Sequence, residues 1–323
     1  MASMQKRKER VAMLSVASNA TLVIFKVIAG VLTGSVAIIS EAIHSGMDLL
    51  AAFIALFSVK KSHLPADDLH PFGHGKFESV SGLVEAALIF LAAFWIIFEA
   101  LKKLTSSQAV ESVGWGVLVM CLSAGVNFVV SRKLFEVGYE ADSLALTADA
   151  WHLRTDVYTS LGVMVSLGII WLGHLLFENP RIHWLDPVAA IFVAVLILKA
   201  AWHLTAKALT DLMDVKLPPD EEQWIRGVIA GCQPEIHGYH RFRTRKAGNF
   251  RFVEFHIKVD PHMTVDASHD ITRGLKHRMM VQYPTATVTI HIEPCDGNCS
   301  AECLAGCFLP EKQRPRRKVR LSP

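Results

Sequence analysis

The sequence carries no strong excess of charge of either sign. Its 33 basic and 30 acidic residues give a net charge of +3, which is too small to indicate a nucleic-acid partner. The spacing of the six cysteines does not require an oxidising compartment. No internal repeat, long low-complexity stretch or HExxH motif is present. These absences leave hydrophobicity as the main signal.

Hydrophobic residues make up 51% of the 323 residues, and the mean hydropathy is +0.33. Both values are high for a soluble chain of this length. A helix needs about 20 mostly apolar residues to cross a bilayer. Six segments approach or exceed that length: Val11–Gly34, Val36–Val59, Val80–Leu101, Gly114–Val130, Leu144–Leu172 and Pro187–Leu209. The sequence therefore predicts six transmembrane helices in a lipid bilayer.

Basic residues indicate how these helices are oriented, because lysine and arginine are enriched on the cytoplasmic side of a membrane. They gather before the first span and in two alternate connections, at Lys6, Arg7, Lys8, Arg10, Lys60, Lys61, Lys76, Arg132 and Lys133. Lys102 and Lys103 on the other side weaken this contrast without reversing it. We expect both termini to be cytoplasmic.

A soluble pattern begins after the sixth span. One helical segment is followed by two alternating strands around a Lys-Ala-Gly-Asn turn, a second helix and a third strand. This α-β-β-α-β order predicts a small α+β domain with its helices over one face of the sheet. We expect a transmembrane domain at 1–210, a cytoplasmic domain at 211–294 and a cysteine-containing basic tail at 295–323.

Two predicted spans each contain a histidine and an aspartate four residues apart, His44 with Asp48 and His152 with Asp156. This spacing places both side chains of a pair on one helical face. Ionisable groups inside a membrane are costly and usually mark an ion or proton path. Two imidazoles and two carboxylates also suit a tetrahedral divalent metal. The pattern indicates a metal transporter.

HSGMD in the second span, HLRTD in the fifth and the soluble domain resemble the cation diffusion facilitator family over nearly the whole chain. The resemblance implies a six-helix membrane protein with a metallochaperone-like cytoplasmic domain, a homodimer joined through that domain, and a location in a bacterial inner membrane. It also implies divalent metal efflux by proton antiport and no enzymatic activity. Imidazole ligands favour zinc, which would be both cargo and regulator, with cadmium, cobalt, nickel or iron as further cargo.

The resemblance also assigns a second metal site to the loop between the second and third spans, at Asp67, His70 and His74. Lys76 resembles a lysine that pairs across the family's dimer with an acidic residue after the sixth span. Asp214 is the first candidate for that partner, and Asp211 is the alternative.

A cytoplasmic binuclear metal site at the dimer interface is implied at His240, His256, His269, His291 and Glu293. Four further candidate metal ligands, Cys295, Cys299, Cys303 and Cys307, recur every four residues. On one continuous helix they would form a drifting stripe, so closure around one ion within a single chain is expected to be strained. The cysteines could capture soft metal ions, form an additional dimer site, or belong to an unstructured redox-active segment.

Two other functions fit parts of the pattern. An intramembrane metalloenzyme would use the bound ion to activate water, but no separate general base accompanies the four ligands. A metal-responsive channel or sensor would bind metal without proton coupling. A proton gradient should drive metal flux only in the antiporter.

Overall fold

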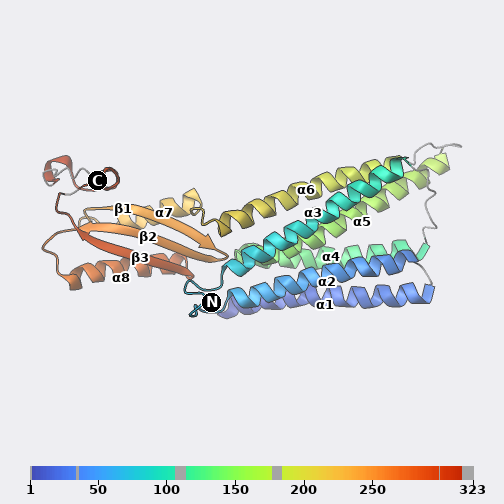
Figure 1. The fold of residues 1–323 in the computed structure, drawn as a ribbon, viewed down its shortest axis with the longest axis horizontal. Coiled ribbons are helices and arrows are strands. Elements are labelled where there is room, and N and C mark those ends of the chain that lie inside the picture. The colour runs from blue at the N-terminus through green and yellow to red at the C-terminus, as the bar shows by residue number, and fades with distance from the viewer. Residues whose placement is uncertain (1, 34–35, 106–113, 177–183, 298, 315–323) are drawn as a thin grey trace. The chain divides into compact units, whose positions relative to one another are not determined.

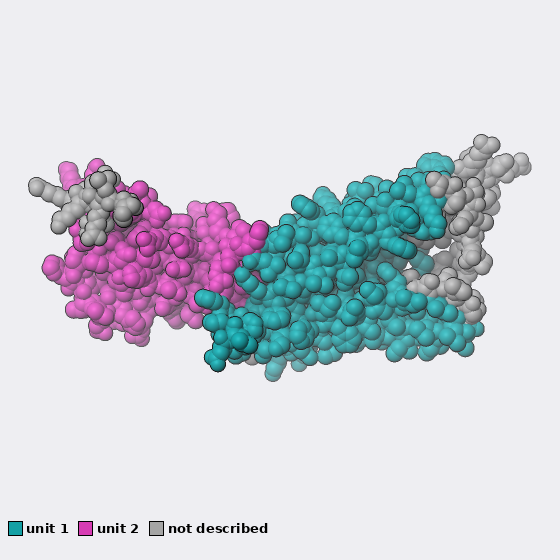
Figure 2. Space-filling view, viewed as in Figure 1, with its two compact units in different colours: residues 1–212 teal, residues 213–323 magenta. Residues whose placement is uncertain are grey.

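The computed structural model of the protein describes residues 2–33, 36–105, 114–176, 184–297 and 299–314 (Figure 1). The chain divides into two compact units, Met1–Leu212 and Met213–Pro323 (Figure 2). The first unit is helical, and the second combines helices with a small sheet. Each unit has its own buried apolar core.

The first unit contains the six predicted helices, each longer than its apolar segment because the polar ends continue the helix. They are α1 (Ala2–Thr33), α2 (Val36–Ser62), α3 (Lys76–Thr105), α4 (Gly114–Glu140), α5 (Leu144–Leu176) and α6 (Leu185–Leu212). Within the described residues, four helices are long and apolar enough to cross a membrane, over Ser3–Leu32, Ala42–Ser62, Lys76–Lys102 and Pro187–Leu212. Large apolar side chains such as Trp95 and Trp202 are exposed on the bundle, as expected for a surface that contacts lipid.

Helix α5 joins the two apolar clusters of the bundle. Its Leu146 and Leu153 pack in a cluster with α1, α2 and α4, whereas its Leu144 packs in a second cluster with α3 and α6. The many alanines in both clusters allow close approach between the helices. Helix α5 therefore packs against helices of both clusters, and this packing positions the polar side chains that it carries.

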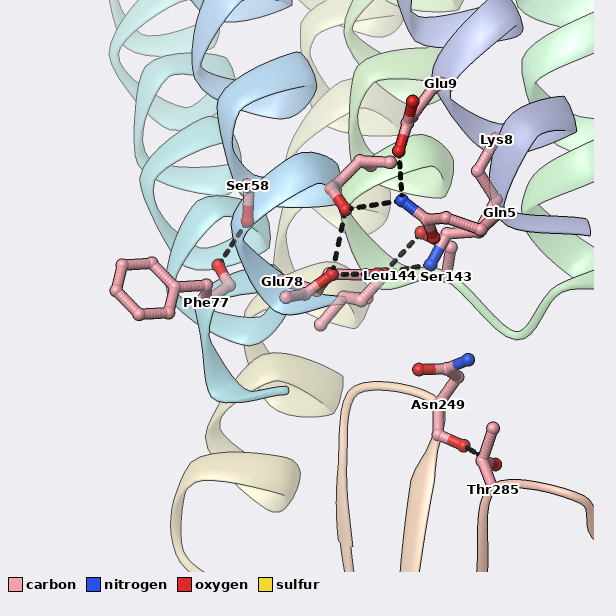
Figure 3. A network of polar contacts seen from close by, with 12 residues as sticks. Gln5, Lys8, Glu9, Ser58, Phe77, Glu78, Ser143, Leu144, Asn249 and Thr285 are labelled. Atoms are coloured by element: carbon pink, nitrogen blue, oxygen red, sulfur yellow. Dashed lines mark hydrogen bonds and ion pairs between the residues drawn. The ribbon is translucent and has the colours of Figure 1, made fainter. Parts of the chain in front are cut away.

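A buried polar network connects several helices at one end of the bundle (Figure 3). The Lys8 ammonium group of α1 forms an ion pair with the Glu78 carboxylate of α3, and these side chains are 3% and 0% exposed. Ser62 of α2 donates a hydrogen bond of 2.9 Å to Glu78, and Ser143, immediately before α5, donates another. Glu78 thus links four helices or their ends through a fully satisfied carboxylate.

We expect Glu78→Gln to lower the free energy of unfolding by about 3–5 kcal/mol, because it leaves the Lys8 charge buried without its partner. Denaturant unfolding of the purified protein in detergent measures this change. Glu140→Gln is the matched control. It removes an ion pair of 2.6 Å with Arg7 between two side chains that are each more than 40% exposed, and the expected loss is at most about 1 kcal/mol. Equal losses in the two variants would contradict a special role for the buried pair.

The second unit has the predicted α-β-β-α-β order, with α7 (Pro219–Ala230), β1 (Gly238–Ala247), β2 (Phe250–Val259), α8 (Val265–Gln282) and β3 (Ala286–Pro294). The sheet has the order β1-β2-β3, in which β1 and β2 are antiparallel and β2 and β3 are parallel. A short helix, α9 (Ala301–Ala305), and a 3₁₀ turn at Glu311–Gln313 follow β3. The predicted fold class is therefore confirmed.

The two faces of this sheet differ in chemistry. Phe255 and Ile257 of β2 are fully buried in a cluster that includes Ile229 of α7 and Leu275 of α8. Alternate residues of a strand point to opposite faces, so His256 of β2 lies on the face away from both helices. The parallel register pairs His256 with His291 of β3, and Lys258 with Glu293. This second face is where the polar ligand candidates gather.

Candidate metal centres

The first centre lies between α2 and α5. His44 and Asp48 share one face of α2, and His152 and Asp156 share one face of α5. Contacts run between the helices: His152 Nε2 lies 3.1 Å from Asp48 Oδ1, and His44 Nε2 lies 3.9 Å from Asp156 Oδ1. One ligand atom from each of His44, Asp48 and Asp156 lies within 4.8 Å of the others. The structure thus brings all four side chains together.

The four groups offer two imidazole nitrogens and two carboxylates, a donor set that zinc binds at about 2.0–2.2 Å. The side chains of His152 and Asp48 are only 9% and 5% exposed, whereas that of His44 is 52% exposed. The centre is therefore shielded from solvent at His152 and accessible to solvent at His44. Binding an ion at those distances would require the four donors to draw closer around it.

The second centre is the loop between α2 and α3. His70 Nδ1 lies 3.1 Å from Asp67 Oδ1, and His74 Nε2 lies 3.3 Å from Asp67 Oδ2. Gly73 has a φ of +81°, a conformation that favours glycine and lets the chain turn back between the two histidines. The backbone hydrogen bond from His70 lowers the pKa of Asp67. His74 Nδ1 lies 3.1 Å from the Pro65 carbonyl, and donating a proton there leaves Nε2 free to bind metal.

The third centre lies on the open face of the sheet. Glu293 accepts hydrogen bonds from both His240 Nε2 at 3.1 Å and His256 Nδ1 at 2.7 Å. The His291 ring lies 4.6 Å from the His256 ring between centroids. Burial raises the pKa of Glu293, but hydrogen bonds from Lys258 and His256 outweigh it and lower the pKa to about 2. Burial lowers the pKa of His240, which favours the neutral imidazole that binds metal.

His269 is the one predicted member of this set that lies elsewhere. It is exposed on α8, and α8 packs through Leu275 on the opposite face of the sheet. Within the described residues of one chain, the group that could hold an ion contains His240, His256 and Glu293 without His269. The sequence pattern could not show this separation, because it depends on which face of the sheet α8 covers.

The expected pairing of Lys76 with Asp214 stays a prediction. Lys76 Nζ donates a hydrogen bond of 3.2 Å to the Leu212 carbonyl. The Asp214 carboxylate forms an ion pair of 3.2 Å with Arg245. The alternative acidic residue, Asp211, accepts a hydrogen bond of 3.4 Å from Ser79.

The cysteines do not follow one continuous helix. Cys295 comes directly after β3, Cys303 lies in the five-residue helix α9, and Cys307 follows that helix. All four line one small pocket beside β1, so the strain expected for a regular helical stripe does not arise. Residues 315–323 of the basic tail lie outside the described part of the chain.

Two residues near the cysteines were missed by sequence reasoning. His237, which resembles an ordinary surface histidine in the sequence, lines the cysteine pocket, and its Nδ1 is buried with no hydrogen-bond partner among the described residues. Lys258 lines the same pocket and also forms an ion pair of 2.8 Å with Glu293. Only the alternation of side chains between the two faces of β2 could have indicated that Lys258 lies on the same face as His256.

The apolar helix bundle, the polar cluster between α2 and α5 and the appended α+β domain together define a membrane transporter for cations. Residues 12–213 match the cation efflux transmembrane domain, and residues 217–295 match the cytoplasmic domain of cation efflux proteins. The chain belongs to the cation diffusion facilitator family and is a cation efflux transporter.

Two relatives match most of the chain. The chain is 33% identical to an uncharacterised transporter of Synechocystis sp. over 285 residues, which cover 88% of this chain and 90% of that protein. It is 30% identical to the cation-efflux pump FieF of Yersinia pestis over 286 residues, which cover 88% and 92% of the two chains.

Among solved structures, the metal-bound C-terminal domain of the CzcD transporter from Thermotoga maritima is 34% identical, with a TM-score of 0.23. The match covers 25% of this chain and 93% of that one. The Zn form of the transporter CzrB is 32% identical, with a TM-score of 0.24, and the match covers 25% and 92% of the two chains.

Proposed function

We propose that the protein exports Zn²⁺ across a bacterial inner membrane in exchange for protons, with both termini in the cytoplasm. The observation that carries this proposal is the meeting of His44, Asp48, His152 and Asp156 between α2 and α5. A transported ion needs a site that is specific yet reversible. Histidine provides the reversibility, because a proton and a metal ion compete for the same ring nitrogen.

The donor set favours zinc and cadmium, with cobalt, nickel and ferrous iron as weaker candidates, and it disfavours magnesium and manganese. Uptake of zinc, cadmium, cobalt, iron and manganese into proteoliposomes tests this order. We expect zinc and cadmium to enter at least about tenfold faster than manganese, a preference of about 1.4 kcal/mol. Manganese uptake as fast as zinc uptake would contradict the proposed ligand set.

We propose that Asp67, His70 and His74 form a metal site separate from the transport centre. The support is their geometry, in which one aspartate contacts both histidines. Equilibrium counting of bound zinc tests the site, with Asp67→Asn compared against its exposed neighbour in Asp68→Asn. Loss of the same amount of zinc in both variants would count against a specific site.

We propose that His240, His256, His291 and Glu293 form a regulatory zinc site in a homodimer joined through the cytoplasmic domain. Zinc that binds the tightened dimer more strongly would shift the population toward that state. Because His269 lies on the other side of the sheet, its participation would require a second chain. Sedimentation of the full-length protein with and without zinc tests the idea, and a zinc response that persists in His256→Ala would contradict it.

A further inference from the structure

The segment Cys295–Cys307 is folded back against the sheet. The Cys295 N–H donates a hydrogen bond of 2.8 Å to the Val259 carbonyl at the end of β2. Ser300 then caps α9 by accepting a hydrogen bond of 3.1 Å from the Cys303 N–H. The first contact extends the pairing of β2 with β3 by one residue, and the second fixes the start of α9.

Backbone contacts hold the far end of this segment on β1. The Tyr239 N–H donates to the Gly306 carbonyl at 3.0 Å, and the Phe308 N–H donates to the His237 carbonyl at 2.8 Å. A Cβ atom at Gly306 would lie 1.9 Å from the Tyr239 carbonyl oxygen, so only glycine permits this approach. The segment is therefore fitted to β1 at a defined position.

The four cysteines line one cavity of about 10 Å³, which His237 and Lys258 also line. A volume near 10–15 Å³ accommodates about one water-sized occupant. Cys303 is 5% exposed, and Nδ1 of His237 is buried with no hydrogen-bond partner among the described residues. A small pocket lined by four cysteines, beside a histidine with an unsatisfied ring nitrogen, is suited to a thiophilic metal ion.

The sulfur atoms are more widely spaced than the ligand atoms of the other three centres. Among the described residues, sets of three ligand atoms within 4.8 Å occur at those centres and not among the thiols. Zinc–sulfur bonds of about 2.3 Å require the thiolates to draw closer. Lys258 is positioned to offset part of the negative charge of four thiolates around a dication.

We propose that Cys295, Cys299, Cys303 and Cys307 bind one structural zinc ion within a single chain, fastening the C-terminal segment to β1. Three of the four cysteines lie beyond the matched domains, the second of which ends at residue 295. The site's ligand atoms are four sulfurs, whereas those of the proposed transport centre are nitrogens and oxygens. Its ion is retained during transport.

Cobalt binding to the full-length, reduced protein in detergent tests the proposal, because thiolate ligands give cobalt an intense near-ultraviolet charge-transfer band that histidine and carboxylate ligands do not. We expect the band to saturate at one ion per chain and to be displaced by zinc. Cys299→Ser and Cys303→Ser should weaken the binding that produces the band by more than about 100-fold. Cys121→Ser, which changes a cysteine far from the pocket in sequence, should leave it unchanged.

A second measurement does not depend on the folding of variants. Zinc should protect all four thiols of the parent from alkylation, as read by mass spectrometry, and chelation should remove the protection. Absence of the cobalt band in the parent, or an unchanged band in both serine variants, would overturn the proposal. Saturation at one ion per two chains would overturn the single-chain site. Asp48→Ala should retain the band even though it loses transport, which separates this proposal from the proposed transport function.

Discussion

Asp48→Ala is expected to reduce zinc transport by at least about 100-fold, a loss of about 2.7 kcal/mol or more in binding or transition-state free energy. In the proposed centre Asp48 supplies an oxygen ligand, and it also contacts His152 at 3.1 Å, so its removal would eliminate one donor and release a second. The initial rate of zinc uptake into proteoliposomes measures the effect. Asp48→Asn, which keeps the shape and loses the charge, should show a similar loss.

The control for this experiment must change an aspartate without changing the centre. Asp142 lies between α4 and α5 with a φ of +49°, a conformation that asparagine tolerates well. Asp142→Asn should transport zinc like the parent. Asp48→Ala must also unfold at the same temperature as the parent, so that a loss of transport reports on the centre and not on misfolding. A correctly folded Asp48→Ala protein that still transports zinc at the parental rate would eliminate the proposed transport centre.

An imposed pH gradient is expected to drive zinc accumulation of about 100-fold per pH unit. The reason is that in the proposed centre two histidines bind the ion and two protons replace it, and each proton moved down one pH unit supplies about 1.4 kcal/mol. Vesicles with an acidic interior should therefore take up zinc as protons leave. Collapsing the gradient with a protonophore should abolish the accumulation.

The membrane potential distinguishes the possible stoichiometries. Exchange of one Zn²⁺ for two protons moves no net charge, so a potassium diffusion potential should leave the accumulation unchanged. Exchange for one proton would give only about tenfold accumulation per pH unit and would carry a cost of about 2.3 kcal/mol per 100 mV against an opposing potential. Zinc flux that depends on the zinc gradient and does not change with the pH gradient would identify a channel.

Local spacing was enough to predict which side chains of the proposed transport centre share a helical face. Because His44 and Asp48 are one helical turn apart, they had to share a face of α2, and the same holds for His152 and Asp156 on α5. The sequence did not show that the close contacts run between helices, from His152 to Asp48 and from His44 to Asp156. That pairing depends on how α2 and α5 pack.

The buried network at Glu78 was not predictable in the same way. Lys8 belongs to the basic cluster that indicates membrane orientation, and its sequence neighbours suggest a solvated charge. In the structure its side chain is 3% exposed and contacts Glu78, 70 residues later in the chain. No local pattern specifies a contact over that separation.

The sequence by itself determined the six apolar helices, the α-β-β-α-β domain and the chemistry of the candidate ligands, because hydrophobic periodicity and turn residues act over a few positions. Tertiary structure alone decided which ligands meet. It placed His256 beside His291 through the parallel register of β2 and β3, and it left His269 on the opposite side of the sheet. It also turned the four cysteines around one pocket. These outcomes depend on packing between segments distant in the chain, which no local periodicity encodes.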